Sequence, residues 1–379
     1  MFSLENLVDL SLIWYGLIAT AIFLYILLDG FDLGVGILFP FAPSDKCRDR
    51  MMNSIAPFWD GNETWLVLGG GGLFAAFPLA YSVIMPALYI PIIAMLLGLI
   101  FRGVAFEFRF KASAESRRIW DYSFHFGSLL AAFMQGVVIG AVVQGIQVEG
   151  RRFAGGTFDW LNAYSVMTGV AVVFGYALLG ATWLVMKTDD ETQDWARKGA
   201  SYTIGYVALF LAIVSISMPI MNPDIRARWF SLPNFFFLLP IPTASLVMLI
   251  IIWRDLHAGR EYRPFLLSFG VFLTGYIGIA ISIWPYVVPF EITFRQAAAV
   301  AESQSLLLVG TLTIAIKGRI DEARQRTEAH LTESNLTLAM HLQSQGHLDQ
   351  AFEKYRECVV NNTLLERLYN LGLDYERRR

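Results

Sequence analysis

The sequence predicts an all-α membrane protein with nine transmembrane helices. Of its 379 residues, 55% are hydrophobic and only 16% are charged, whereas about a quarter of the residues of a typical soluble domain are charged. Nine stretches before residue 317 approach the roughly 20 apolar residues that a helix needs to cross a bilayer. The net charge of −3 predicts no nucleic-acid partner.

Polar breaks that carry Pro, Gly or charge separate the predicted spans. The spans are expected at residues 10–28, 64–80, 83–101, 123–143, 162–186, 202–221, 233–253, 265–287 and 298–316. The ninth is the weakest, because Glu302, Ser303 and Gln304 interrupt it and leave only 305–316 cleanly apolar.

Lys and Arg are distributed unevenly between the loops. The loops that follow odd-numbered spans hold 14 of them, and those that follow even-numbered spans hold 5. Since basic residues near span ends stay in the cytoplasm, the N-terminus is predicted to be periplasmic and the C-terminal tail cytoplasmic. No Lys or Arg precedes the first span, so we expect it to remain as a span and not to act as a cleaved signal.

The composition changes after the ninth span. We predict a transmembrane domain over 1–316, a charged helical linker over 317–333 and partial tetratricopeptide-like repeats over 334–379. The repeat pattern comprises Leu338, Ala339, Leu342, Ala351, Tyr355 and Cys358, and it restarts at Leu371, Gly372 and Tyr375. This tail is either a cytoplasmic docking arm or a fusion or assembly join with no role in the membrane chemistry.

Ionisable residues inside a membrane cost about 2.5–3.5 kcal/mol each on insertion scales, so each is a functional candidate. Asp29 and Asp32 stand three residues apart, which places both carboxyl groups on one helix face. Gly30, Gly34 and Gly36 form an adjacent stripe that permits another helix to approach closely. The alternative is that both acids lie in water at the cytoplasmic membrane edge and are structural.

A second polar motif, Asn-Ser-Ile-Ala-Pro-Phe-Trp-Asp-Gly-Asn-Glu-Thr-Trp, occupies residues 53–65. Pro57 interrupts a helix there, and a Gly-rich helix follows. Asp60 and Glu63 beside closely packed helices indicate a buried hydrophilic path. The other residues singled out are Trp59, Asn62 and Trp65; the two indoles are equally explained as interface anchors.

A third motif, Phe-Arg-Gly-Val-Ala-Phe-Glu-Phe-Arg, covers residues 101–109 at the end of the third span. Arg102 is expected to pair with Asp60 or Glu107 and to keep the acid ionised. Alternatively, Arg102 and Arg109 only anchor the cytoplasmic end of the helix.

The sequence gives no sign of a metal or haem site in this chain. Of five histidines only His125 lies at a predicted span, whereas membrane haems usually need His or Met axial ligands inside the bundle. Cys47 and Cys358 share no metal-binding spacing. Buried acids without a catalytic metal fit a proton-conducting or structural subunit whose reaction centre belongs to a partner.

Three motifs carry a resemblance to a known family. Residues 29–36, 53–65 and 71–78 resemble the signature of subunit II of cytochrome bd ubiquinol oxidase, and the resemblance covers about residues 8–315. Further matches lie at 101–109, Trp284-Pro285-Tyr286 and Gln296-Ala297-Ala298. The sequence departs from the family at Glu107, where many relatives have Asp, at Phe58, where some have His, and in its tail.

The resemblance implies a respiratory oxidase of the bacterial cytoplasmic membrane that oxidises ubiquinol and reduces dioxygen to water in aerobic respiration. It implies a partner, subunit I, that binds two haem b groups, one haem d and the quinol; small extra subunits can join. This chain is then expected to bind no cofactor, although a structural quinone is left open, and to fold as two four-helix bundles plus one helix. The family residues associated with a proton path fall on Asp29, Asp32, Asp60, Arg102 and Glu107.

Two other functions remain open from the sequence. A secondary transporter often has paired bundles with a site at broken helices near the membrane midplane, but spans five to eight carry almost no charge. A purely structural scaffold subunit is the second alternative.

Overall fold

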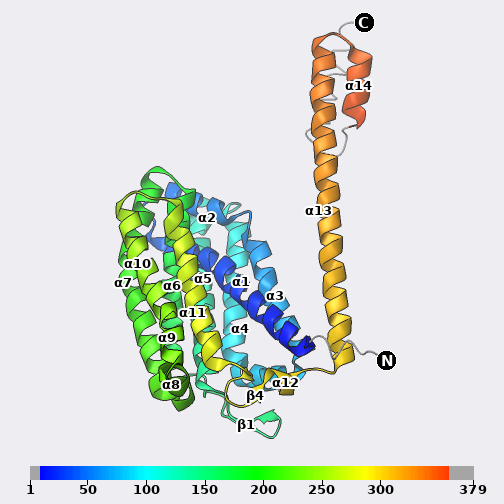
Figure 1. The fold of residues 1–379 in the computed structure, drawn as a ribbon. Coiled ribbons are helices and arrows are strands. Elements are labelled where there is room, and N and C mark those ends of the chain that lie inside the picture. Colours follow the sequence, from blue (N-terminus) through cyan, green and yellow to red (C-terminus); the bar gives the residue numbers. More distant parts are fainter. Residues whose placement is uncertain (1–8, 358–379) are drawn as a thin grey trace. The chain divides into compact units, whose positions relative to one another are not determined.

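The computed structural model describes residues 9–357 of the chain (Figure 1). It divides into two compact units, Met1–Gln304 and Ser305–Arg379, and each is described by itself. The first unit is almost entirely helical, with two short hairpins, and holds all three polar motifs.

The helices of the first unit are α1 (Leu10–Leu38), η2 (Phe39–Phe41), α2 (Asp45–Ile55), α3 (Trp59–Ala76), α4 (Pro78–Arg109), α5 (Ala114–Gln144), α6 (Ala163–Lys187), α7 (Asp190–Met221), α8 (Pro223–Phe230), α9 (Asn234–Leu238), α10 (Pro240–His257), α11 (Tyr262–Ile283) and α12 (Phe294–Ala297). Two antiparallel hairpins pair β1 (Val148–Glu149) with β2 (Arg152–Phe153) and β3 (Tyr286–Val288) with β4 (Ile292–Thr293).

Within the described residues, seven helices are long and apolar enough to cross a membrane: α1, α4, α5, α6, α7, α9 with α10, and α11. An all-α membrane protein is therefore confirmed as the fold class. The predicted second span corresponds to α3, whose apolar run is shortened by Asp60 and Glu63 at its start. The ninth corresponds to the beginning of a longer helix, α13 (Ala301–Ser344). The count of nine spans stays a prediction.

The long helices pack mainly against their neighbours in sequence. In the first half α4 packs on α5 and α1 on α3 and α5; in the second half α6 packs on α7 and α10 on α11. Contacts of α1 and α5 with α6 join the halves. α2 lies at one end of this unit, and β1 and α12 lie at the other (Figure 1). The division into two four-helix bundles plus one helix stays a prediction.

The boundary between α3 and α4 differs from the sequence prediction. Spans were expected at 64–80 and 83–101, but α3 ends at Ala76 and α4 already begins at Pro78. Proline favours the first turn of a helix, where its missing N–H would have no intrahelical partner. The apolar composition continues through this break, so hydropathy alone places it a few residues late.

Asp9 and Arg295 tie the start of α1 to α12. Asp9 caps α1 by accepting a hydrogen bond from the Leu12 backbone N–H at 3.1 Å, and its Oδ2 lies 3.0 Å from Arg295 Nη2. The hydrogen bond from Arg295 lowers the pKa of the Asp9 carboxyl. A carboxylate at a helix N-terminus also interacts favourably with the helix dipole.

The glycine stripe on α1 makes the predicted close helix contacts. A Cβ atom at Gly34 would lie 1.8 Å from the Tyr176 carbonyl oxygen and 2.8 Å from the Gly180 nitrogen, both on α6. A Cβ at Gly30 would meet the Tyr176 ring at 2.7 Å, and one at Gly36 would meet Ser128 Oγ of α5 at 2.0 Å. α1 therefore touches α5 and α6 nearly backbone to backbone beside Asp29 and Asp32.

The second unit contains α13 from Ser305 onward and α14 (Leu348–Glu357). α13 runs without a break through the predicted domain boundary at 316 and the linker at 317–333. It ends in a Schellman motif, with Gly346 at φ +84° and the His347 N–H bonded to the Leu342 carbonyl. Ala339 and Ala351 are buried, as the repeat pattern requires of its small positions. The predicted repeat residues Cys358, Leu371, Gly372 and Tyr375 lie outside the described residues, and the tetratricopeptide assignment stays a prediction.

Gly34→Ala is expected to destabilise the protein, because its methyl group overlaps the α6 backbone, which cannot rotate away as a side chain does. Overpacking of this kind costs about 1–3 kcal/mol. The check is the thermal unfolding midpoint of the purified protein. Gly16→Ala on the same helix is the control, since a Cβ there meets nothing within 4 Å. Equal midpoints for the two variants would contradict the contact.

Candidate functional site: a buried charge cluster

The two acids of α1 are fully buried. Asp29 and Asp32 each have 0% exposure, so the alternative that they lie in water is wrong. They sit in the second half of α1, on the part of the helix where nearly every residue is buried. Burial at this depth requires that the carboxyl groups find partners within the protein.

Arg102 of α4 is the common partner. Its Nη1 lies 3.2 Å from Asp29 Oδ1 and 2.7 Å from Glu63 Oε1, and its Nη2 lies 3.5 Å from Asp32 Oδ2. The guanidinium group is completely buried, whereas 30% of the Glu63 side chain is exposed. Three acids from α1 and α3 therefore surround one base from α4.

Asn62 and Trp59 complete the cluster from α3. The Asn62 amide donates to Asp32 Oδ2 at 2.7 Å and to the Leu28 carbonyl at 3.1 Å, which fixes α3 against α1. The Trp59 ring lies 5.6 Å from the Arg102 guanidinium carbon, at cation–π distance. The same ring packs on Phe106 of α4. Trp59 is thus part of the arginine's site and does more than anchor a helix at the interface.

Several polar atoms of this cluster have no hydrogen bond within the described residues. They are both carboxylate oxygens of Asp29, Oδ1 of Asp32, and Nε and Nη2 of Arg102. Buried groups of this kind are normally satisfied by ordered water or a ligand. The cluster therefore has free hydrogen-bonding capacity around Asp29, and acids outnumber bases in it. Such a site can hold exchangeable protons.

The remaining predicted residues lie apart from the cluster. Asp60 is exposed on the first turn of α3. Glu107 is 61% exposed and its nearest ionic partner is Lys111, with the nitrogen and oxygen 4.0 Å apart. The expected pairing of Arg102 with Asp60 or Glu107 is therefore wrong, since Glu63 and the two acids of α1 take their places. Trp65 is half-buried farther along α3.

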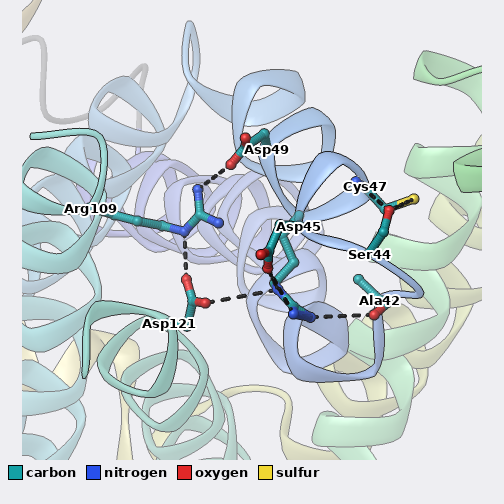
Figure 2. A network of polar contacts seen from close by, with 8 residues as sticks. Ala42, Ser44, Asp45, Cys47, Asp49, Arg109 and Asp121 are labelled. Carbon is teal, nitrogen blue, oxygen red and sulfur yellow. Dashed lines mark hydrogen bonds and ion pairs between the residues drawn. The ribbon is translucent and has the colours of Figure 1, made fainter. Parts of the chain in front are cut away.

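A second buried arginine has a structural role that the sequence analysis missed. Arg109 has 0% exposure, and its guanidinium group binds Asp49 of α2 and Asp121 of α5, each at 2.5 Å (Figure 2). Arg48 extends this network to Asp45, at 2.9 Å, and to the Ala42 carbonyl. The interpretation of Arg109 as a simple positive anchor is too weak, because the residue ties three helices together.

His125 makes a packing contact and no ionic one. Its Nδ1 lies 3.2 Å from the Gly36 carbonyl, and its ring packs edge-on against Phe41 and Phe126. Across the described residues no group of three or more His, Cys, Asp or Glu side chains is arranged to hold a metal ion.

Seven long apolar helices around a buried cluster of one arginine and three acids define a multi-pass membrane protein with an internal ionisable site. Residues 10–316 match the family described as cytochrome bd terminal oxidase subunit II, and the chain belongs to that family. The match ends where the sequence predicts the end of the transmembrane domain.

Individual relatives agree with this assignment. The chain is 35% identical over 208 residues to cytochrome bd ubiquinol oxidase subunit 2 of Bacillus subtilis, which covers 54% of this chain and 61% of that one. It is 36% identical over 189 residues to cytochrome bd-I ubiquinol oxidase subunit 2 of Escherichia coli K12, covering 48% and 50%. These alignments span only half to three-fifths of the relatives' length.

The fold is similar to a chain in the structure of bd oxidase from Geobacillus thermodenitrificans. The TM-score is 0.67 with 16% sequence identity, over 83% of this chain and 98% of that one. At this identity the similarity concerns the fold alone.

Arg102→Met is expected to destabilise the protein by about 3–5 kcal/mol, because it leaves the buried Asp29 and Asp32 without a cation. Adding Asp29→Asn and Asp32→Asn to this variant should recover part of the loss, since both amides are neutral. Thermal unfolding midpoints of the three proteins provide the measurement. An unaltered midpoint for Arg102→Met alone would show that the acids do not depend on this arginine.

Proposed function

We propose that the chain is subunit II of a heterodimeric cytochrome bd-type quinol oxidase in the bacterial cytoplasmic membrane. Its reaction is the oxidation of quinol coupled to the reduction of dioxygen to water. The family match supports the assignment, and the relatives from B. subtilis and E. coli are named as subunits of ubiquinol oxidases. The buried Arg102 cluster is the observation that supports a chemical role beyond scaffolding.

The haem groups belong to the partner in this proposal. The haem-binding subunit I holds two haem b groups and one haem d and oxidises ubiquinol, and small extra subunits can join the complex. The surroundings of His125 support this assignment, since its ring is engaged with the Gly36 carbonyl and packs against Phe41.

The proposed task of this subunit is to deliver protons. Reduction of one dioxygen to two waters consumes four protons, and these come from the cytoplasm. Exposed Asp60 and Glu107 collect protons at the end of the domain predicted to be cytoplasmic. Glu63, which is partly exposed and also bound to Arg102, connects that surface to the interior.

Arg102 organises the interior step. The Glu63 and Asp29 carboxylates both contact its Nη1, so their oxygens lie close enough for water to bridge them. A guanidinium group does not release its proton in proteins, so Arg102 holds charge while the acids exchange protons. Asp29 and Asp32 then pass protons toward the interface with subunit I.

The two alternative functions, a secondary transporter and a purely structural scaffold, are judged by different observations. A secondary transporter is expected to place charge in both halves of the fold. Among the described residues of α6 to α11 the one buried charged side chain is Asp255, and it pairs with Arg263 at 3.2 Å near the helix ends. This asymmetry favours the oxidase subunit. A purely structural scaffold is tested by substitution of the acids.

Asp29→Asn is expected to lower the oxygen uptake of the assembled complex by at least about tenfold, because an amide cannot carry the proton. Glu107→Gln is the comparison: an exposed collecting group has substitutes, so the loss should be less than half. Both variants are measured after confirming the b and d haem bands in the reduced-minus-oxidised spectrum. Wild-type uptake by Asp29→Asn with intact haem bands would make the subunit a scaffold.

Truncation at Lys317 is expected to leave oxygen uptake unchanged, because the family match ends at residue 316 and the cluster lies far earlier in the chain. The measurement is the amount of assembled complex and its oxygen uptake. Since the cut falls within α13, truncation at Gln345, after that helix, is the control. Loss of assembly in the first variant alone would assign the tail a role in completing the ninth helix.

A further inference from the structure

A second polar group, made of Tyr25, Gln135 and Tyr176, lies beside the charge cluster and is not used by the proton path above. These residues come from α1, α5 and α6, and their exposures are 4%, 5% and 0%. Tyr176 reaches this position because Gly30 and Gly34 leave room for it against α1. Three polar side chains thus meet inside the membrane-spanning domain, where an unpaired polar group is costly.

Their hydrogen bonds form a chain with one direction. The Tyr176 hydroxyl donates to Gln135 Oε1 at 2.6 Å, and Gln135 Nε2 donates to the Tyr25 hydroxyl oxygen at 2.7 Å. Tyr25 accepts a bond from Gln135, so its own O–H must donate elsewhere. Each donor in the series therefore points from α6 toward α1.

Asp29 is the candidate acceptor for the Tyr25 hydroxyl. It follows Tyr25 by four residues, the spacing that places side chains next to each other on a helix. Both Asp29 oxygens are buried and form no hydrogen bond within the described residues, so they are free to accept the Tyr25 O–H. The other groups that face this carboxyl are Arg102 of α4, Asp32 of α1 and Glu63 of α3.

We propose that Tyr25, Gln135 and Tyr176 are positioning residues that set the proton affinity of Asp29 in the proposed proton path. A donor chain that ends on a carboxylate stabilises the ionised form, and neighbouring hydrogen bonds polarise one another. The proposal rests on the function assigned above. Two separate interactions then stabilise the ionised Asp29 carboxylate: the charge of Arg102 and the dipoles of this hydrogen-bond chain.

The middle residue, Gln135, indicates that this chain tunes the proton affinity of Asp29 and does not conduct protons. A hydroxyl group readily passes on one proton while it accepts another, but a side-chain amide keeps both of its hydrogens in its stable form. Gln135 between two tyrosines therefore interrupts a proton wire. The hydrogen-bond chain from Asp29 to Tyr176 therefore does not conduct protons, and protons leave Asp29 by another route.

The test uses the complete oxidase complex and the pH dependence of oxygen uptake. Tyr25→Phe removes the donor to Asp29, so the acid keeps its proton to higher pH. The alkaline limb of the profile should move up by about one to two pH units, given about 1.5–3 kcal/mol for a hydrogen bond to a charged group and 1.36 kcal/mol per unit. Tyr176→Phe, which acts through Gln135, should shift the limb in the same direction by less.

Tyr276→Phe is the matched control, because Tyr276 also binds α1, through the Ala19 carbonyl at 2.7 Å, but away from Asp29. It should leave the profile in place. The carbonyl stretching band of protonated Asp29, identified by its loss in Asp29→Asn, should move in Tyr25→Phe and stay fixed in the control. In the Asp29→Asn background Tyr25→Phe should cause no further shift.

The outcomes separate this inference from the proposed function. If Asp29→Asn lowers uptake but the profile and the carbonyl band of Tyr25→Phe match the wild type, the tuning role is wrong while the proton path stands. Equal shifts in Tyr25→Phe and the Tyr276→Phe control would also overturn the tuning role. The loss of any buried hydroxyl would then be enough to shift the pH profile. If Asp29→Asn itself has no effect on oxygen uptake, the proposed proton path is wrong, and the tuning role that rests on it is wrong as well.

Discussion

The guanidinium group of Arg102 is the charge around which the first half of this domain is built. A cation buried in a membrane-spanning bundle is costly unless acids and hydrogen bonds compensate it. Here the compensation comes from two other helices: Asp29 and Asp32 from α1 and Glu63 from α3. Removing any of these helices would leave a buried charge, so the cluster constrains how α1, α3 and α4 are arranged.

The glycines of α1 and the two arginines of α4 complete that arrangement. Gly30 and Gly34 bring α6 against the side of α1 next to the acids, and the close contact leaves no room for bulk water between these two helices. Arg102 and Arg109 are seven residues apart, so both project from nearly the same side of α4. The first binds acids deep in the domain and the second binds Asp49 and Asp121 beside α2. Both arginines therefore link α4 to neighbouring helices.

The sequence predicted the fold class, the acidic pair and the glycine contacts, because these depend on composition and on spacing within one helix. It paired Arg102 with the wrong acids, because pairing depends on helix rotation. Trp59 and Glu63 are four residues apart on α3 and share a face, whereas Asp60 points away. Glu107 lies five residues after Arg102, about 140° around the helix at 3.6 residues per turn.

Contacts between residues of different helices could not be predicted from the sequence. Nothing in the spacing of Tyr25, Gln135 and Tyr176 indicates that they meet, since they come from three helices and each alone is typical of a membrane span. The partners of Arg109 were equally hidden, because Asp49 and Asp121 lie in segments that were expected only to be polar connections. The heptad separation of the two arginines was the one local signal that both face the protein interior.

Time-resolved proton uptake by the reduced complex after mixing with oxygen tests whether the Arg102 cluster carries the protons. A pH indicator in the bulk solution reports uptake, and the haem spectra report oxygen binding in the same sample. In Asp32→Asn, oxygen should bind at the wild-type rate while proton uptake slows by at least about tenfold. Uptake at the wild-type rate in that variant would show that the protons travel by a route outside this cluster.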